Sequence, residues 1–253
     1  MARPASFAAD DGMTLIEVLV TMVIGMVVMA AALTLMTDGF TSSARVQDRA
    51  DASGRARQAL DRATSLLQAQ ICNGTISPVI AANTTSITFT ANNGDPSATP
   101  VQYQLRYVAG AGGTPGRLEE RRWTMGATPN ANGTYPLSAV GSWIEIVDGV
   151  EPVAITSPAT PVFRYYGTDN TTTNEPKELT SPYVVGTTPI VAPLPAGDLR
   201  RVLRVDIDLR VLPARWNDLA KARRLSSRLH TSAYVTSNLD PVKLEQGPQC
   251  SAA

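Results

Sequence analysis

The sequence has little of several residue types on which common functional sites depend. Its 253 residues include two cysteines and one histidine, so a metal site built from several such ligands is not expected. Lysine and arginine number 22, and aspartate and glutamate also number 22, so the basic excess of a nucleic-acid-binding protein is missing. Charged residues make up 17% of the chain, which is below the usual quarter and leaves a largely neutral, polar surface.

Long apolar runs are also scarce, because only one segment exceeds the length of a strand. It extends from Met13 to Met36, and Glu17 is its only charged residue. A helix of about 20 apolar residues is long enough to cross a bilayer. The sequence therefore predicts a single membrane span near the N-terminus, with the rest of the chain on the far side.

Two general interpretations of this run are open. It could be an ordinary signal anchor, or a secretory signal peptide cut near residues 30–32, where the small residues lie. The second lacks a basic n-region, because Arg3 is opposed by Asp10 and Asp11. A charged residue inside a span costs roughly 2.5–3.5 kcal/mol, so Glu17 indicates a function unless it stays wet at the interface.

A third interpretation rests on the sequence GMTLIEV at residues 12–18. It resembles the type III signal sequence of type IV pilins and type II secretion pseudopilins, although Met13 stands where that family usually has phenylalanine. In the family, a membrane peptidase cuts after the glycine, the new N-terminus is methylated, and the fifth mature residue is glutamate. The resemblance implies cleavage between Gly12 and Met13, N-methylation of Met13, and assembly roles for Thr14 and Glu17.

The resemblance also gives Glu17 a physical role. Cleavage would free an ammonium group on Met13, and in a bundle of such helices this cation and the Glu17 carboxylate would both lie in apolar surroundings. An unpaired buried charge is expensive, whereas a paired one is tolerated. A Met13 amine meeting the Glu17 of a neighbouring copy would therefore set the axial register between subunits.

The helical pattern continues beyond the span as an amphipathic stem. A helix from Met13 to about Ile71 would be about 90 Å long, and Asn73-Gly74 is a plausible stop. Asp51 and Arg55 have the spacing of an ion pair within the helix. The predicted apolar stripe, which would pack on the rest of the chain, consists of Val46, Ala50, Leu60, Ala63, Leu67 and Ile71.

From about residue 77 the pattern becomes that of β-strands, which favours an α+β, pilin-like fold with the long helix packed on an antiparallel sheet. Residues 1–12 are expected to form the leader, 13–36 the span, 37–73 the stem helix and 74–253 a β-rich head outside the cytoplasm. The strands are expected at residues 86–91, 101–108, 117–125, 143–147, 162–166, 199–212 and 226–236.

The strand expected at 199–212 alternates apolar and charged residues, which predicts a charged outer face. Asp206 and Asp208 lie on that face and are interpreted as cross-strand salt partners of arginines rather than as calcium ligands. His230 is expected to be solvated or packed on its strand, and Arg121, Arg122 and Trp123 are expected to mark a solvated face.

Two further features leave alternatives open. Cys72 and Cys250 would both lie outside the cytoplasm, where a disulfide between them is possible, but the sequence does not decide whether they pair. The segment 167–197 is longer than an ordinary loop. It could either contact a partner or be a flexible surface loop without a function of its own.

The function that the resemblance implies is that of a structural subunit, a minor pilin or pseudopilin, and not of an enzyme. Its expected partners are a prepilin peptidase and N-methyltransferase, other pilins or pseudopilins, an inner-membrane assembly platform and the cytoplasmic membrane. No cofactor, metal or nucleic acid is expected. The alternative is a single-span anchored protein whose outer domain binds a ligand or adhesion target without polymerising.

Overall fold

The computed structural model describes most of the chain. The described residues are 14–73, 76–92, 99–131, 133–152, 161–167, 177–179, 184–185, 188–189, 193–195, 199–200, 202–214 and 219–235. The predicted leader at 1–12, Met13 and Cys250 lie outside them, as does most of the segment 167–197. The chain divides into two compact units, residues 1–47 and 48–253.

Helix α1 (Leu15–Gln68) begins directly after Thr14, whose carbonyl oxygen accepts the N–H groups of Glu17 and Val18 at 3.0 and 3.2 Å. The predicted end near Ile71 is three residues too late. Instead of continuing the helix, Ile71 donates its N–H to the Thr90 carbonyl at 3.0 Å. The chain leaves α1 because its next backbone groups bond to a strand.

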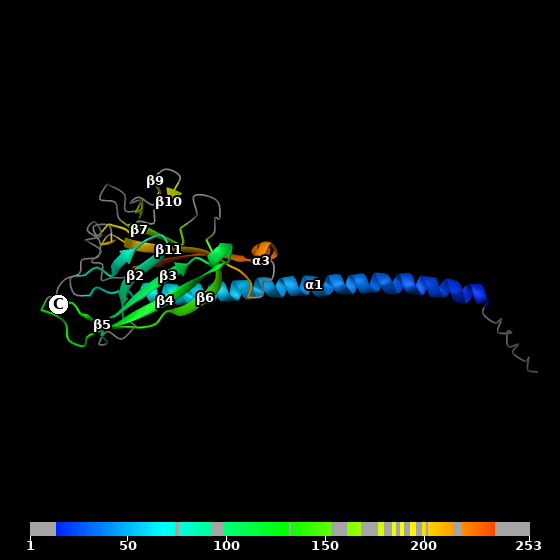
Figure 1. The fold of residues 1–253 in the computed structure, drawn as a ribbon, viewed down its shortest axis with the longest axis horizontal. Coiled ribbons are helices and arrows are strands. Elements are labelled where there is room, and N and C mark those ends of the chain that lie inside the picture. Colours follow the sequence, from blue (N-terminus) through cyan, green and yellow to red (C-terminus); the bar gives the residue numbers. More distant parts are fainter. Residues whose placement is uncertain are drawn as a thin grey trace, which may run out of the picture. The chain divides into compact units, whose positions relative to one another are not determined.

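The sheet of the second unit is antiparallel (Figure 1). Its strands, in spatial order, are β1 (Val79–Ala82), β2 (Ser86–Ala91), β3 (Val101–Val108), β4 (Gly116–Met125), β6 (Ile144–Glu151), β11 (Val202–Val211), β7 (Phe163–Gly167) and β8 (Lys177–Glu178). Strand β5 (Leu137–Val140) also pairs with β4, and β12 (Ser227–Tyr234) also pairs with β11. The other described elements are the 3-10 turn η1 (Ala111–Gly113), the short helix α3 (Leu219–Leu225) and a hairpin of β9 (Val184–Val185) and β10 (Thr188–Pro189).

The α+β, pilin-like architecture predicted from the sequence is confirmed, since a long N-terminal helix is followed by a curled antiparallel sheet. All seven expected strands are present, with ends that differ by a few residues, and β6 extends to Glu151. The sequence pattern missed β1, β5 and α3. These elements are short, and four or seven residues carry too little periodicity to stand out.

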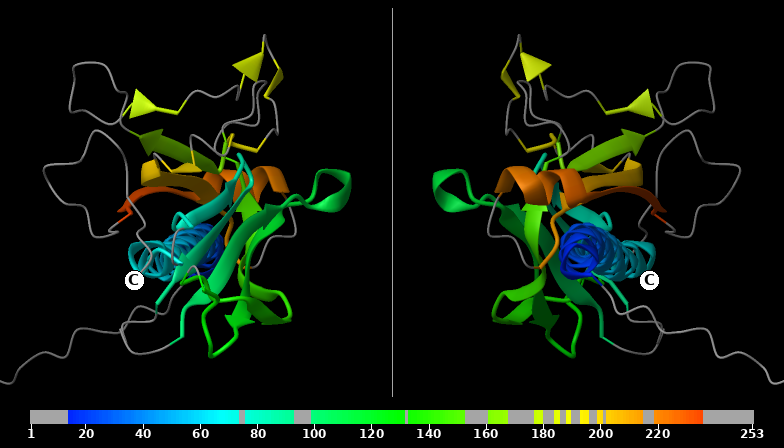
Figure 2. Two further views of the ribbon diagram at one scale, coloured as in Figure 1. Left: turned by 90° about the vertical axis from the view of Figure 1, so that its left-hand side faces the viewer. Right: turned by 90° about the vertical axis from the view of Figure 1, so that its right-hand side faces the viewer.

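The second half of α1 packs into the hollow of this sheet (Figure 2). Its buried residues are Ala52, Ala56, Ala59, Leu60, Ala63, Leu66 and Leu67. From Ala56 onward they share one core with side chains from the strands, including Ile87, Phe89, Leu105, Leu118, Tyr165 and Ile207. The alanines let the helix backbone approach the sheet closely, and the leucines fill the space toward its end.

The predicted start of the buried apolar stripe on α1 was therefore wrong. Val46 is 65% exposed and Ala50 is also exposed, whereas Leu60, Ala63 and Leu67 are buried as expected and Ile71 is half-buried. Helical periodicity shows which face of a helix can be buried. It does not show how far along the helix the sheet extends.

Polar contacts between α1 and the strands accompany this packing. Arg62 donates two hydrogen bonds, at 2.9 and 2.8 Å, to the Glu120 carboxylate, and these bonds raise the pKa of Arg62 despite the opposing effect of burial. The predicted Asp51–Arg55 pair is not what the structure shows. Asp51 accepts the N–H of Ala214 at 3.0 Å, and Arg55 bonds instead to Asp148 and to the Leu212 carbonyl.

We expect Leu67→Ala to lower the free energy of unfolding of the head by about 2–5 kcal/mol, because Leu67 is fully buried and its truncation leaves a cavity. The measurement is denaturant unfolding of the full chain in detergent, followed by tryptophan fluorescence. The matched control is Val46→Ala on the same helix, which should change the value by no more than about 0.5 kcal/mol. Equal losses for both variants would contradict the observed start of the buried stripe.

Candidate functional site

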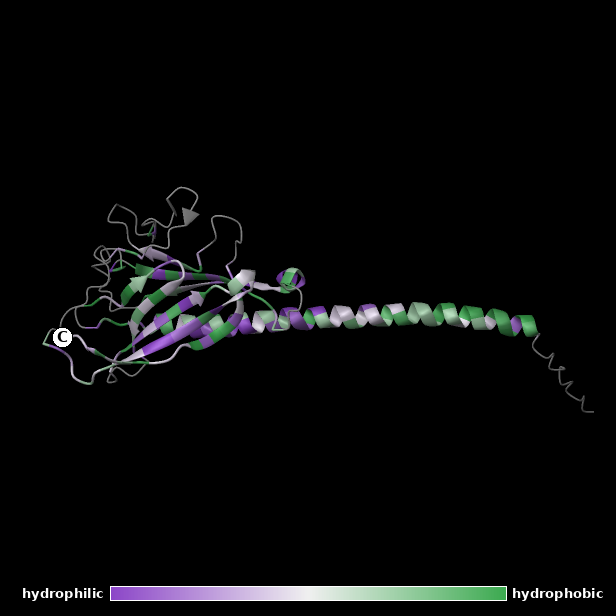
Figure 3. Ribbon diagram, in the orientation of Figure 1, coloured by the Kyte–Doolittle hydropathy of each residue, from purple (hydrophilic) through white to green (hydrophobic). Residues whose placement is uncertain are grey.

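The first part of α1 exposes an unusual amount of apolar surface (Figure 3). Its exposed large side chains are Leu15, Ile16, Val18, Leu19, Val20, Met22, Val23, Ile24, Met26, Val27, Val28, Met29, Leu33, Leu35, Met36 and Phe40. By length and composition this part of the helix can cross a membrane, and none of its most apolar window is buried by the described residues. It fits the membrane-anchored protein that the sequence predicts.

The polar side chains within this segment bond to their own helix. The hydroxyl groups of Thr21, Thr34 and Thr37 donate to the carbonyl oxygens three residues earlier, at 2.9, 2.7 and 2.8 Å. Such bonds hide a hydroxyl from an apolar environment. The segment therefore presents apolar groups around nearly its whole circumference.

Glu17 is the exception. It lies exposed in the first turn of α1, where the positive end of the helix dipole favours a carboxylate. Among the described residues it has no ion-pair partner. The part of the chain that the structure describes thus contains one carboxylate at the start of a long apolar surface, and nothing that neutralises it.

A model of the prokaryotic N-terminal methylation motif matches residues 8–33. The chain carries a prepilin-type N-terminal motif. Together with the long apolar helix that follows, this motif is consistent with a type IV pilin-like protein that is processed at its N-terminus. No curated protein and no solved structure matches the chain. The match covers the end of the predicted leader and most of the predicted span, so the head of this pilin-like chain has to be interpreted from its own structure.

Some of the predicted site residues belong to the described part of the chain, and others lie outside it. Thr14 and Glu17 lie at the start of α1, while Gly12 and Met13 lie outside the described residues. Cys72 is disulfide-bonded. Cys250, the other cysteine of the sequence, is not among the described residues, so its pairing with Cys72 stays a proposal.

Among the described residues of the head, five acidic side chains are buried, and each is bound to an arginine. Glu119 bonds to Arg106 and Arg117, Glu120 to Arg62, Glu151 to Arg223, Asp206 to Arg204, and Asp208 to Arg228. A buried carboxylate is tolerated when it is paired and hydrogen-bonded. Four of these pairs join different elements, either two neighbouring strands or the sheet and α1 or α3, so we assign them a structural role.

The prediction for strand β11 needs a correction. Asp206 and Asp208 are only 4% and 5% exposed, because β6 and β7 pair with one edge of β11, β12 pairs with the other, and arginines cover the charged face. Asp208 has the expected cross-strand partner, Arg228 of β12, at 3.0 Å. Asp206 pairs instead with Arg204 of its own strand at 3.0 Å, and His230 lies 3.8 Å from it.

Arg121 departs from the solvated face predicted for it. Its guanidinium lies 4.3 Å from the ring centres of both Trp123 and Trp143, and Arg106 lies 3.5 Å from the ring of Trp143. Arg121 also donates to the Gln104 side chain at 3.0 Å. The result is a half-buried group of stacked arginines and tryptophans on the face of β3 and β4. The sequence pattern missed it because Trp143 is distant in the chain.

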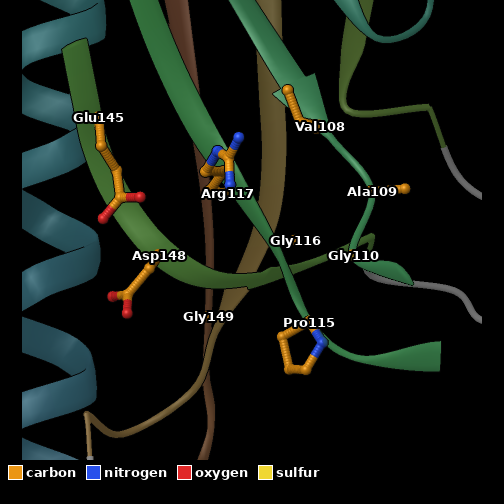
Figure 4. Close-up of a pocket in the computed structure, with 9 residues that line it drawn as sticks. All are labelled: Val108, Ala109, Gly110, Pro115, Gly116, Arg117, Glu145, Asp148 and Gly149. Carbon is orange, nitrogen blue, oxygen red and sulfur yellow. The ribbon is translucent and has the colours of Figure 1, made fainter. Parts of the chain in front are cut away.

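A small pocket lies beside η1 (Figure 4). It has a volume of about 160 Å³ and is lined by Val108, Ala109, Gly110, Pro115, Gly116, Arg117, Glu145, Asp148 and Gly149. Asp148 is already bound to Arg55, and Arg117 to Glu119. The described residues include no group of three or more histidines, cysteines or carboxylates that could hold a metal ion.

The Glu119 pairs predict a loss of stability in acid. Burial alone would raise the pKa of the Glu119 carboxyl, but the hydrogen bonds from Arg117 and Arg106 outweigh burial and hold that pKa below its ordinary value. A lowered carboxyl pKa stabilises the folded state above the unfolded pKa, and this stabilisation is lost as the pH falls through the folded pKa. We expect the difference in unfolding free energy between the native chain and Glu119→Gln to be largest at neutral pH and to shrink below about pH 5.

Denaturant unfolding of the full chain at several pH values measures this difference. Glu145→Gln on the neighbouring strand is the control, because Glu145 is exposed and makes none of these arginine bonds. A Glu119→Gln difference that stays constant between neutral and acidic pH would contradict the assignment.

Proposed function

We propose that this protein is a minor pilin or pseudopilin, a structural subunit rather than an enzyme. Its leader would be removed between Gly12 and Met13, and Met13 would be N-methylated by the same peptidase. The subunit would wait in the cytoplasmic membrane as a single-pass protein with its head outside the cytoplasm. It would then join a type IV pilus-like filament, or the tip of one. The observation that carries the proposal is the methylation motif, which overlaps the start of an exposed apolar helix.

The exposed surface of α1 supports assembly as well as anchoring. In the membrane, lipid covers the apolar side chains of its first part, and in a filament the same side chains would be covered by helices of neighbouring subunits. Two such surfaces pack by dispersion between closely fitting side chains. Because the threonine hydroxyls are bonded within the helix, they do not oppose this transfer.

Glu17 would then supply the register. A helix bundle held only by apolar contacts can slide along its axis at little cost. The Met13 amine created by cleavage and the Glu17 carboxylate are the only groups in this segment whose burial requires a partner of opposite charge. A subunit whose Glu17 meets the amine of its neighbour has one preferred axial position. The expected partners are thus a prepilin peptidase, other pilins or pseudopilins and an inner-membrane assembly platform.

Processing can be tested directly on the chain recovered from its native membrane. We expect its mature N-terminus to be Met13 carrying one methyl group, as read by mass spectrometry of the N-terminal peptide. An intact leader would support the alternative of an anchored binding or adhesion protein that does not polymerise. A start near Thr34 would indicate ordinary secretion, and either result would contradict the proposal.

Glu17→Ala separates processing from assembly. The variant should be cleaved at nearly the normal level, because the scissile bond is unchanged, but it should be almost absent from filaments, since the amine of its neighbour would lose its partner. Immunoblots of membrane and sheared-filament fractions measure both quantities. Asp38→Ala is the matched control, because it removes an exposed carboxylate of the same helix beyond the apolar run. Normal recovery of Glu17→Ala in filaments would refute the register mechanism.

A further inference from the structure

Strand β5 has one free edge. Its residues pair with β4 through the partners Trp123 and Val140, Thr124 and Ala139, and Met125 and Leu137. No other described strand pairs with β5, and all four of its residues are exposed. No described strand therefore bonds to the backbone N–H and C=O groups of its outer edge.

This edge is short and has an irregularity in its pairing with β4, but it lacks two features that usually protect a free strand, namely charge and proline. Proteins keep exposed edges from pairing by placing charged residues or proline on them. The sequence of β5 is Leu-Ser-Ala-Val, which has neither. By contrast, β12, which pairs only with β11, carries Arg228 and the half-exposed His230. The open edge of β5 is thus suited to pairing with an added strand.

Apolar side chains surround the same edge. Leu137, Val140 and Ile144 are 53%, 59% and 54% exposed. Among the described residues from 48 onward, the other exposed large hydrophobic side chains are Ile76 and Tyr234, which lie elsewhere. The cross-strand neighbour of Val140 is Trp123, which belongs to the arginine–tryptophan group described above. Tryptophan and arginine are enriched at the energetic centres of protein interfaces.

The charges next to β5 are positive and unneutralised. Arg121 donates to Gln104 and lies over two tryptophan rings, and Arg122 is exposed; neither has an ion pair with a described residue. Being adjacent in β4, the two arginines lie on opposite faces of the sheet. The nearest carboxylates in β4, Glu119 and Glu120, are bound to other arginines. Glu145 pairs in register with Glu119, about 13 Å along β4 from the partner of Val140.

We propose that β5 is a docking edge for an extended acidic segment of a partner protein, which adds to the sheet as a further strand. The backbone groups of β5 would hold the segment. Its apolar side chains would cover Leu137 and Val140, and its carboxylates would meet Arg121 on one face and Arg122 on the other. An added strand lies roughly 9–10 Å from β4, a distance that an arginine and a glutamate can span together over the short side chains of Ser138 and Ala139.

This docking edge goes beyond the proposed filament function and does not depend on it. An anchored protein that never polymerised could use the same edge to bind its target. The test therefore uses the binding of a defined peptide to the full chain in detergent and not the yield of filaments.

The probe is a short peptide in which two valines alternate with two glutamates, so that each face of the extended chain carries both residue types, compared with its valine–lysine counterpart. We expect the acidic peptide to bind, to slow hydrogen exchange at the amides of β5, and to bind more weakly at high salt. The basic peptide should bind at least about tenfold more weakly. Equal binding of the two peptides, no binding of either, or binding without protection of β5 would overturn the proposal.

Three variants locate the site. Val140→Lys places a charge on the free edge, and the double variant Arg121→Gln with Arg122→Gln removes the cations but keeps hydrogen-bonding groups. Each should weaken binding of the acidic peptide at least about tenfold. His230→Lys on β12 is the matched control, because it places a charge on another strand and should not change binding. Protection of β5 that rises with protein concentration and needs no peptide would assign the edge to a second copy of this chain and reject an acidic partner.

Discussion

One constraint governs the use of this molecule: the first part of α1 cannot remain in water. Its side chains from Leu15 to Met36 are almost all apolar and exposed, and its threonine hydroxyls are bonded within the helix. Lipid or other helices of the same kind must therefore cover it. Within that apolar surface, Glu17 is acceptable only near an interface or beside a cation. The methylation motif provides the chemistry that would create such a cation, since cleavage before Met13 frees an amine.

In the second part of the same helix, the apolar side chains are covered rather than exposed. From Ala52 onward, the sheet of the same chain covers the apolar face of α1. Alanines and leucines of the helix lie against the sheet, and Arg55 and Arg62 bond to it from the polar side. A single helix thus serves as an apolar rod over one part of its length and as a structural element of the head over another. Buried acid–arginine pairs fasten strands and α3 around it.

The sequence predicts the features that are periodic or local. The run with Glu17 at its fifth residue, the alternation in β3 and the fold class can all be read from neighbouring residues. Features that depend on distant segments cannot. Alternation in β11 correctly separates its two faces, but burial of Asp206 depends on β7 and β12, which cover both edges. Likewise, the stacking of Arg121 depends on Trp143, and the partner of Arg55 lies on β6 rather than one turn away.

The most direct measurement concerns the pairing of Glu17 in the assembled state. Filaments built from a mixture of chains, some with a ¹⁵N-labelled Met13 amine and others with a ¹³C-labelled Glu17 carboxylate, can be studied by solid-state nuclear magnetic resonance. The account predicts a dipolar contact between the amine of one chain and the ionised carboxylate of another, at a separation of about 3–4 Å. A protonated Glu17, or a contact found only within a single chain, would contradict it.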